Sequence, residues 1–194
     1  MSLKNTAGNW GGVARFFHWT TALLIIGNGL YGLWMTGLSP SIQMINAYAL
    51  HKSIGLTVLG LLLLRMAWRF ANRTPHSSPM PRWQHIAAHA VHGLLYLLAL
   101  AMPLSGWWAN SLKGFPLQYF KQINLPSLGS MVNHQWAEVV ITAHLVIFWT
   151  LIGLVVVHAL AALKHHFIDR DTTLKRMLPF ARAHTEDSST GDYK

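Results

Sequence analysis

The most constraining feature of this sequence is an apolar stretch of twenty-five residues without a charge, Val139 to Leu163. A helix rises about 1.5 Å per residue, so this stretch can span a bilayer core of about 30 Å. His144 and His158 lie fourteen positions apart within it, so both side chains leave the same helix face, about 21 Å apart. A single histidine in an apolar helix is often a hydrogen-bonded packing residue. Two in register are harder to explain by packing, because polar groups inside lipid are costly and usually functional.

Composition places the whole chain in a membrane. Only 11% of its 194 residues are charged and 52% are apolar, whereas a soluble domain carries about a quarter charged residues. We therefore expect an all-α integral membrane protein with one membrane domain, 1–194, and no cleaved signal peptide. The predicted elements are four transmembrane helices at about 13–38, 47–70, 83–110 and 135–163, a connector at 111–135 and a tail at 164–194.

Charge asymmetry sets the predicted topology. Four spans put both termini on one side of the membrane, and that side then holds twelve of the fifteen basic residues. Only Lys52, Lys113 and Lys121 fall on the other side. Basic residues concentrate in cytoplasmic segments, so we expect both termini to be cytoplasmic. The formal charge of +9 then reflects topology and does not indicate nucleic-acid binding.

This topology gives each histidine of the fourth helix a partner at its own depth. His18 opens an outward-running helix and lies near the cytoplasmic face with His158, whereas His51 opens the returning helix and lies near the outer face with His144. A bis-histidine haem needs two neutral imidazoles on opposite sides of the porphyrin, hence on different helices. We therefore predict a four-transmembrane-helix bundle that encloses two haems, with the pairs His18/His158 and His51/His144 as iron ligands.

Other metal sites fit the sequence less well. The chain has no cysteine, which excludes iron–sulfur clusters and covalently attached haem. Zinc favours clustered ligands that include carboxylate or thiolate, and the first 137 residues contain no Asp or Glu. His85, His89 and His92 share one face of the third helix. They could ligate the inner haem or line the polar end of the bundle, and the second role is the simpler explanation.

Several residues could serve a flat, anionic cofactor. Lys52 and Arg65 are separated by twelve residues, and a span needs about 20. Their side chains must therefore reach the interfaces or turn inward to an anionic group, such as a haem propionate. Gly27, Gly29 and Gly32 in the first helix would let another helix or a flat ligand approach closely.

Four segments resemble the bacterial cytochrome b561 proteins of the inner membrane. They are Phe17-His18-Trp19, the segment Leu50 to Gly55 (LHKSIG), the His144/His158 pair and, most specifically, Ala161 to Met177 (AALKHHFIDRDTTLKRM). The likeness runs from Gly12 to about Leu178. It implies a multi-pass inner-membrane protein with two non-covalent b-type haems, held by residues matching His18, His51, His144 and His158. It also implies that the third-helix histidines are not ligands. The predicted topology makes the connector 111–135 periplasmic, and its prolines, aromatics and two lysines indicate a surface flap lying on the membrane interface.

The expected chemistry is one-electron transfer, because bis-histidine iron has no open coordination position. The resemblance implies ubiquinone as one partner and, in some members, superoxide as a periplasmic donor, hence an electron-transfer oxidoreductase of the superoxide:ubiquinone type. Two alternatives stay open. A membrane-anchor cytochrome of a larger respiratory oxidoreductase would co-purify with a partner subunit, and a haem-free transporter would be colourless.

Two groups of basic residues have a specific and a general interpretation. Lys52, Lys113 and Lys121 could form a sparse positive patch that steers superoxide, or they could be ordinary anchors at the membrane interface. Arg15, about one turn before His18, could bind a propionate of the inner haem or a lipid headgroup. Lys52 is the corresponding cofactor-binding candidate for the outer haem.

Overall fold

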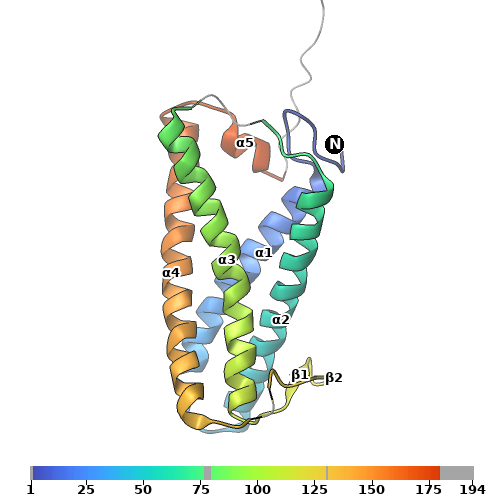
Figure 1. Cartoon of the computed structure of the whole chain (residues 1–194), viewed down its shortest axis with the longest axis vertical. Helices are drawn as coiled ribbons and strands as arrows, with labels where there is room; N and C mark the ends of the chain where they lie inside the picture. The colour runs from blue at the N-terminus through green and yellow to red at the C-terminus, as the bar shows by residue number, and fades with distance from the viewer. Residues whose placement is uncertain (1, 77–79, 130, 180–194) are drawn as a thin grey trace, which may run out of the picture.

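The computed structural model describes residues 2–76, 80–129 and 131–179 and shows a bundle of four long helices with small caps at both ends (Figure 1). A two-stranded antiparallel hairpin lies between the third and fourth helices, and a short helix follows the fourth. The elements are α1 (Gly12–Met35), α2 (Ile42–Ala71), α3 (Arg82–Leu112), β1 (Leu117–Tyr119), β2 (Ile123–Leu125), α4 (His134–Phe167) and α5 (Thr173–Met177).

Three helices of the described chain, α2, α3 and α4, are long and apolar enough to cross a membrane. This confirms the prediction of a helical membrane protein. The 24-residue α1 is not among the three. It carries Arg15, His18 and Asn28 within its length, and these polar side chains lower its average hydropathy. Whether α1 is a fourth span stays a prediction.

The helix boundaries differ from the predicted ones mainly where helices leave the apolar region. The first helix was predicted to reach residue 38 and ends at Met35, while the fourth was predicted to end at 163 and continues through Phe167. Lys164 extends beyond the apolar stretch, and its ammonium binds Asp169 at 2.7 Å. That hydrogen bond holds the pKa of the Asp169 carboxyl below its usual value.

The connector contains regular structure that sequence patterning did not predict. Strands β1 and β2 form a hairpin whose turn has two non-glycine residues with positive φ, Phe120 and Lys121. Two central residues with positive φ are typical of tight hairpin turns. Ser53 on α2 fixes the hairpin, because its hydroxyl oxygen accepts the Phe120 N–H at 2.9 Å. The connector therefore packs onto the helices as a defined cap.

The four helices associate as two pairs. Helix α1 packs mainly against α2, and α3 packs mainly against α4. Between the pairs, the buried residues Val58, Leu62 and Ala99 form an apolar cluster. Gly29 of α1 brings the pairs together, since a Cβ atom there would lie 2.5 Å from Phe148 of α4. The pairs thus meet across a narrow apolar centre.

Hydrogen bonds between distant segments close the end of the bundle opposite the hairpin (Figure 1). The Trp19 indole N–H donates to the Met177 carbonyl at 2.8 Å, and Arg176 Nη1 donates to the His76 carbonyl at 3.0 Å. The His76 backbone N–H in turn donates to the Ala7 carbonyl at 2.9 Å. The N-terminal segment, the α2–α3 link and α5 therefore form one cap.

Replacing Trp19 by Phe removes the indole donor that holds Met177. A hydrogen bond contributes about 1 kcal/mol, so the population with a detached C-terminal segment should rise roughly fivefold. Tryptic cleavage after Lys175 and Arg176 measures that population. Trp83→Phe, at an exposed tryptophan of α3, is the matched control, and equal cleavage of the two variants would contradict the role of Trp19.

Candidate functional site

The structure brings the four predicted ligand histidines together as two pairs. The ring centroids of His18 and His158 lie 6.3 Å apart, and those of His51 and His144 lie 6.4 Å apart. The ring planes are steeply inclined, by 65° in the first pair and 77° in the second. Each pair joins α4 to a different helix of the α1–α2 pair.

These separations fit one metal ion between two imidazoles. A metal–imidazole bond is about 2 Å long and a ring nitrogen lies about 1 Å from the ring centre, so trans ligands have centroids about 6 Å apart. Among the described residues, no group of three or more His, Cys, Asp or Glu side chains could hold a metal ion. Two imidazole rings per pair would suit an iron whose other four ligands come from a porphyrin.

Glycines face the rings of His51 and His144, called the outer pair here because of its predicted depth. A Cβ atom on Gly32 would lie 3.0 Å from Cε1 of His51, and a Cβ on Gly106 would lie 3.1 Å from Cε1 of His144. Both distances are tighter than ordinary van der Waals contact. A side chain at either position would require the facing ring to move by a few tenths of an ångström, so these two glycines help to set the separation of His51 and His144.

The tautomer of His144 follows from its hydrogen bonds. Ser105 Oγ lies 2.8 Å from His144 Nδ1 and also donates to the Met102 carbonyl at 2.8 Å. A hydroxyl has a single hydrogen. Because Ser105 gives it to Met102, its oxygen must accept from the Nδ1–H of His144. The Nε2 lone pair of His144 is then free to bind a metal.

His18 and His158, called the inner pair because of its predicted depth, have a charged neighbour instead. Arg65 Nη2 lies 3.0 Å from His18 Nδ1, and its guanidinium stacks 5.1 Å from the Tyr96 ring centre. Arg69 lies over the same ring at 5.8 Å. Of the two positions predicted for the Arg65 side chain, the structure shows the inward one. It brings a guanidinium into direct contact with a predicted ligand.

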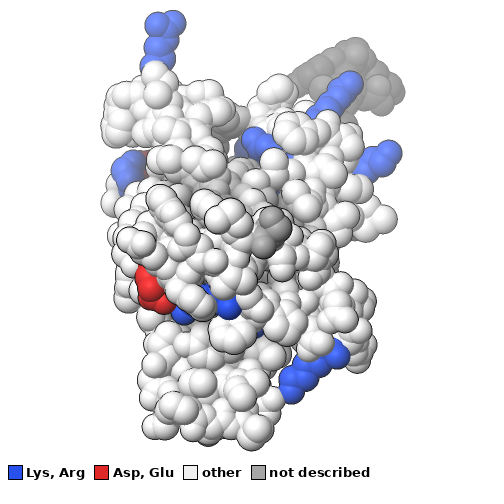
Figure 2. All heavy atoms as spheres, turned by 60° about the horizontal axis from the view of Figure 1, so that its bottom comes forward, with Lys and Arg blue, Asp and Glu red and all other residues white. Residues whose placement is uncertain are grey.

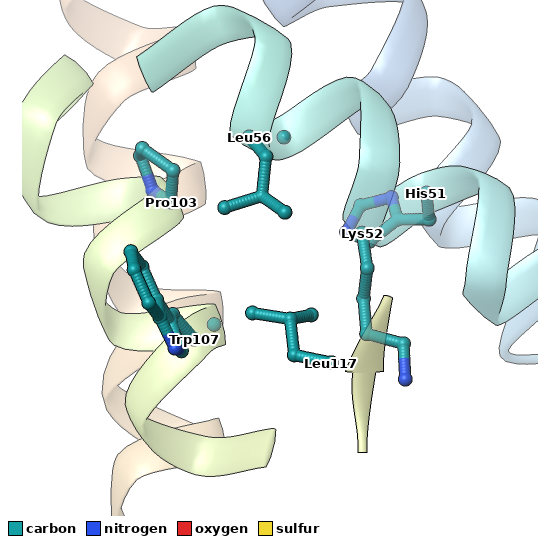
Figure 3. Close-up of a pocket in the computed structure, with 8 residues that line it drawn as sticks. His51, Lys52, Leu56, Pro103, Trp107 and Leu117 are labelled. Carbon is teal, nitrogen blue, oxygen red and sulfur yellow. The ribbon is translucent and has the colours of Figure 1, made fainter. Parts of the chain in front are cut away.

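Two cavities adjoin the outer pair. One of about 50 Å³ is lined by both His51 and His144, together with Asn28, Gly29 and Phe148 among others. A second, of about 40 Å³, shares His51, Gly55 and Pro103 with the first. Its lining is drawn in Figure 3. The outer pair therefore stands in a slot between the helix pairs, lined largely by apolar and small residues.

The two basic residues predicted to bind haem carboxylates have protein partners. Arg15 is buried, and it donates from Nε to the Trp10 carbonyl at 2.9 Å and from Nη1 to the Leu178 carbonyl at 3.1 Å. Lys52 Nζ donates to Asn110 Oδ1 at 3.0 Å. Its side chain extends away from the His51 ring (Figure 3). Their cofactor-binding roles stay predictions.

The third-helix histidines differ from one another in their surroundings. His92 lies 5.3 Å from His158, ring centre to ring centre, and thus borders the inner pair. His85 and His89 are exposed and lie against each other at 4.4 Å. The structure therefore brings only His92 of the three into contact with a predicted ligand.

The lysines of the hairpin end are only partly available as a positive patch. Lys113 pairs with Glu138 at 3.2 Å, so its charge is offset. Lys121 binds Asn46, a neutral amide, at 2.6 Å. Figure 2 shows few charged side chains on this end, on a surface that is mostly uncharged. Lys52 and Lys121 keep an uncompensated charge.

Three residues that contact the outer pair were not predicted from the sequence: Ser105, Gly106 and Asn28. Asn28 had a usable signal, because a polar amide in the middle of an apolar helix is rarely neutral in function. Ser105 and Gly106 had none, since the rotation of α3 against α4 decides which α3 side chains reach His144.

Comparison with known proteins agrees with the resemblance drawn from the sequence. A sequence model of prokaryotic cytochrome b561 matches residues 9–180. Cytochrome b561 homolog 2 of Escherichia coli (strain K12) is 37% identical over 182 residues, covering 92% of this chain and 95% of that protein. The probable superoxide oxidase CybB of Yersinia pestis is 30% identical over 166 residues, covering 85% and 93%.

A third relative, cytochrome b562 of Cereibacter sphaeroides, is 28% identical over 169 residues, covering 83% of this chain and 89% of that protein. All three alignments extend over most of both sequences, so the similarity is not confined to one motif. The chain belongs to the prokaryotic cytochrome b561 family of membrane cytochromes. Membership of this family implies a b-type haem.

Proposed function

We propose that this chain is a dihaem cytochrome that carries single electrons across the bacterial inner membrane. His18 and His158 would hold one b-type haem, and His51 and His144 would hold the other. The observation that carries this proposal is the spacing of the two histidine pairs, whose centroids lie 6.3 and 6.4 Å apart. Both values suit one iron between two imidazoles.

The bound haem supplies reversible one-electron chemistry at iron. Two histidines would hold each iron, which disfavours direct binding of oxygen. Ser105 holds His144 in the tautomer that presents Nε2. The apolar cluster of Val58, Leu62 and Ala99 keeps water away from the region between the two histidine pairs.

The topology proposed here has four spans, with α1 as the fourth. Helix α1 lies along α2 through the bundle (Figure 1) and carries His18. The basic residues concentrate at the end where the N-terminal segment and α5 meet, so the positive-inside rule favours both termini in the cytoplasm. The hairpin end would then face the periplasm.

Ubiquinone is the proposed partner within the membrane, and superoxide is the proposed periplasmic donor. Support comes from the relative in Yersinia pestis that is named a probable superoxide oxidase. Lys52 and Lys121 add to this support, because their hydrogen-bond partners are neutral amides that leave their charges uncompensated. Positive charge near an entrance raises the encounter rate of a small anion.

Four single variants test the proposed function. His51→Ala and His144→Ala should each lose the same one of two b haems, and His18→Ala and His158→Ala should each lose the other. Reduced-minus-oxidised spectra with haem quantified per chain give the result. His85→Ala is the control and should keep both haems. Wild-type protein with fewer than two haems, or a His144 variant that keeps both, would refute the assignment.

A pair of glycine variants tests whether the ring positions matter. Gly32→Val places side-chain atoms against His51 and should remove or strongly weaken the outer haem. Gly27→Val, on the same helix with nothing within 4 Å of its added Cβ, should leave haem content unchanged. Haem-to-protein ratios after purification make the comparison, and equal ratios would show that Gly32 does not position His51.

The steering role of the two lysines can be measured through the rate of haem reduction. Lys52→Gln with Lys121→Gln should slow superoxide-driven reduction several-fold at low ionic strength, with the difference shrinking as salt screens the charges. Lys4→Gln with Lys175→Gln, at the opposite end, should leave the rate unchanged. An unaltered rate in the first double variant at low salt would exclude steering by these side chains.

A further inference from the structure

We propose that Asn28 is a positioning residue for His51, and that its side-chain oxygen accepts the Nδ1 hydrogen of that histidine, directly or through one water molecule. This inference rests on the proposed function and assigns a role in the outer site to a residue of α1. The acceptor atom is identified by the hydrogen bond that the Asn28 amide nitrogen donates.

The orientation of the Asn28 amide is fixed by the backbone of α2. Its Nδ2 donates to the His51 carbonyl at 3.2 Å. A carbonyl oxygen can only accept, so the donor must be nitrogen and the amide cannot be turned over. Asn28 Oδ1 is consequently the free acceptor, and it is buried without a hydrogen-bond partner.

The His51 ring presents the complementary atom. His51 Nδ1 is also buried and makes no hydrogen bond to the described residues, although the main-chain carbonyl of Asn28 lies beside the ring. It faces α1, because a Cβ on Gly32 would lie 3.3 Å from it. Gly32 lies one helical turn after Asn28 on the same face of α1. The two unpartnered atoms therefore belong to the same contact between α1 and α2.

The surroundings favour an interaction between these atoms. A bundle interior offers no bulk water, so buried polar atoms must be satisfied internally. The cavity of about 50 Å³ is lined by both Asn28 and His51. A water molecule fits in such a space when it has two or more polar partners, and these two atoms provide them.

The consequence for His51 parallels that of Ser105 for His144. An acceptor at Nδ1 fixes the proton there and presents the Nε2 lone pair to iron. It also makes the ring a stronger electron donor, which favours the ferric over the ferrous state. Asn28 should therefore lower the midpoint potential of the outer haem, and the strength of the acceptor at position 28 should set how far.

The test is an anaerobic redox titration of the purified protein with two variants that change the acceptor in opposite directions. Asn28→Leu removes it and should raise the outer midpoint, by about a tenfold change in the ratio of oxidised to reduced haem, or about 59 mV for one electron. Asn28→Asp strengthens it and should lower the same midpoint. The component missing in His144→Ala identifies the outer haem.

Thr21→Val is the matched control. Thr21 also lies on α1, is almost fully buried and has an unpartnered hydroxyl, but it lies one turn from His18 and should leave the outer midpoint unchanged. Opposite shifts in the Asn28 variants with an unshifted control support the inference, since a purely structural role would not invert with the charge of the substituent.

Shifts of the same sign, or none, would overturn the role of Asn28. Loss of the outer haem in Asn28→Leu alone would support it. Equal loss in both variants would overturn it, because the hydrogen bond from Nδ2 to the His51 carbonyl, which both substitutions remove, would then be what Asn28 contributes. The haem content of the wild type, measured in the same samples, tests the proposed function separately. Two haems with unresponsive Asn28 variants would reject this inference and leave that function standing.

Discussion

The organisation of this protein depends on the free-energy cost of burying polar side chains in a helix bundle that lies in lipid. Each polar group inside must find a partner from the protein or from a cofactor, because no solvent is available. Here several of those groups meet at histidine rings. Ser105 binds His144 and Arg65 binds His18, while Asn28 holds the backbone carbonyl of His51. Part of the polar content of the bundle thus lies at two depths, with an apolar cluster between them.

The sequence was sufficient for the features that depend on helix periodicity and composition. The fourteen-residue spacing of His144 and His158 fixed both their common face and their separation. The topology predicted from charge asymmetry then gave each of these histidines a partner. In the structure the ring centroids of the two pairs lie 6.3 and 6.4 Å apart. The inward position of Arg65 was one of two outcomes that followed from its distance to Lys52. These predictions needed no knowledge of how the helices rotate against one another.

The features that escaped prediction depend on that rotation or on contacts made across long sequence separations. Ser105 reaches His144 only because of the way α3 turns toward α4, and α3 offers no sequence signal for it. The connector was expected to be a surface flap, yet its hairpin is held by Ser53, which lies sixty-seven residues before Phe120. A turn whose residues are Phe120 and Lys121 lacks the glycine or asparagine that usually marks such a hairpin. The cap at the other end joins Trp19 to Met177, which no local pattern indicates.

Both pairs consist of two histidines, but the residues around them make the two pairs chemically different. His144 has a neutral hydroxyl at Nδ1, and that hydroxyl can only accept because its hydrogen is committed to Met102. His18 has a cationic guanidinium 3.0 Å from the same atom. The described chain has three carboxylates, and none of them lies beside Arg65. Glu138 is near the start of α4, and Asp169 and Asp171 follow its end. A cation next to one ring and a neutral acceptor next to the other distinguish the two sites electrostatically. The four histidines alone would make the two pairs equivalent, so the difference resides in α2 and α3, which contribute Arg65 and Ser105.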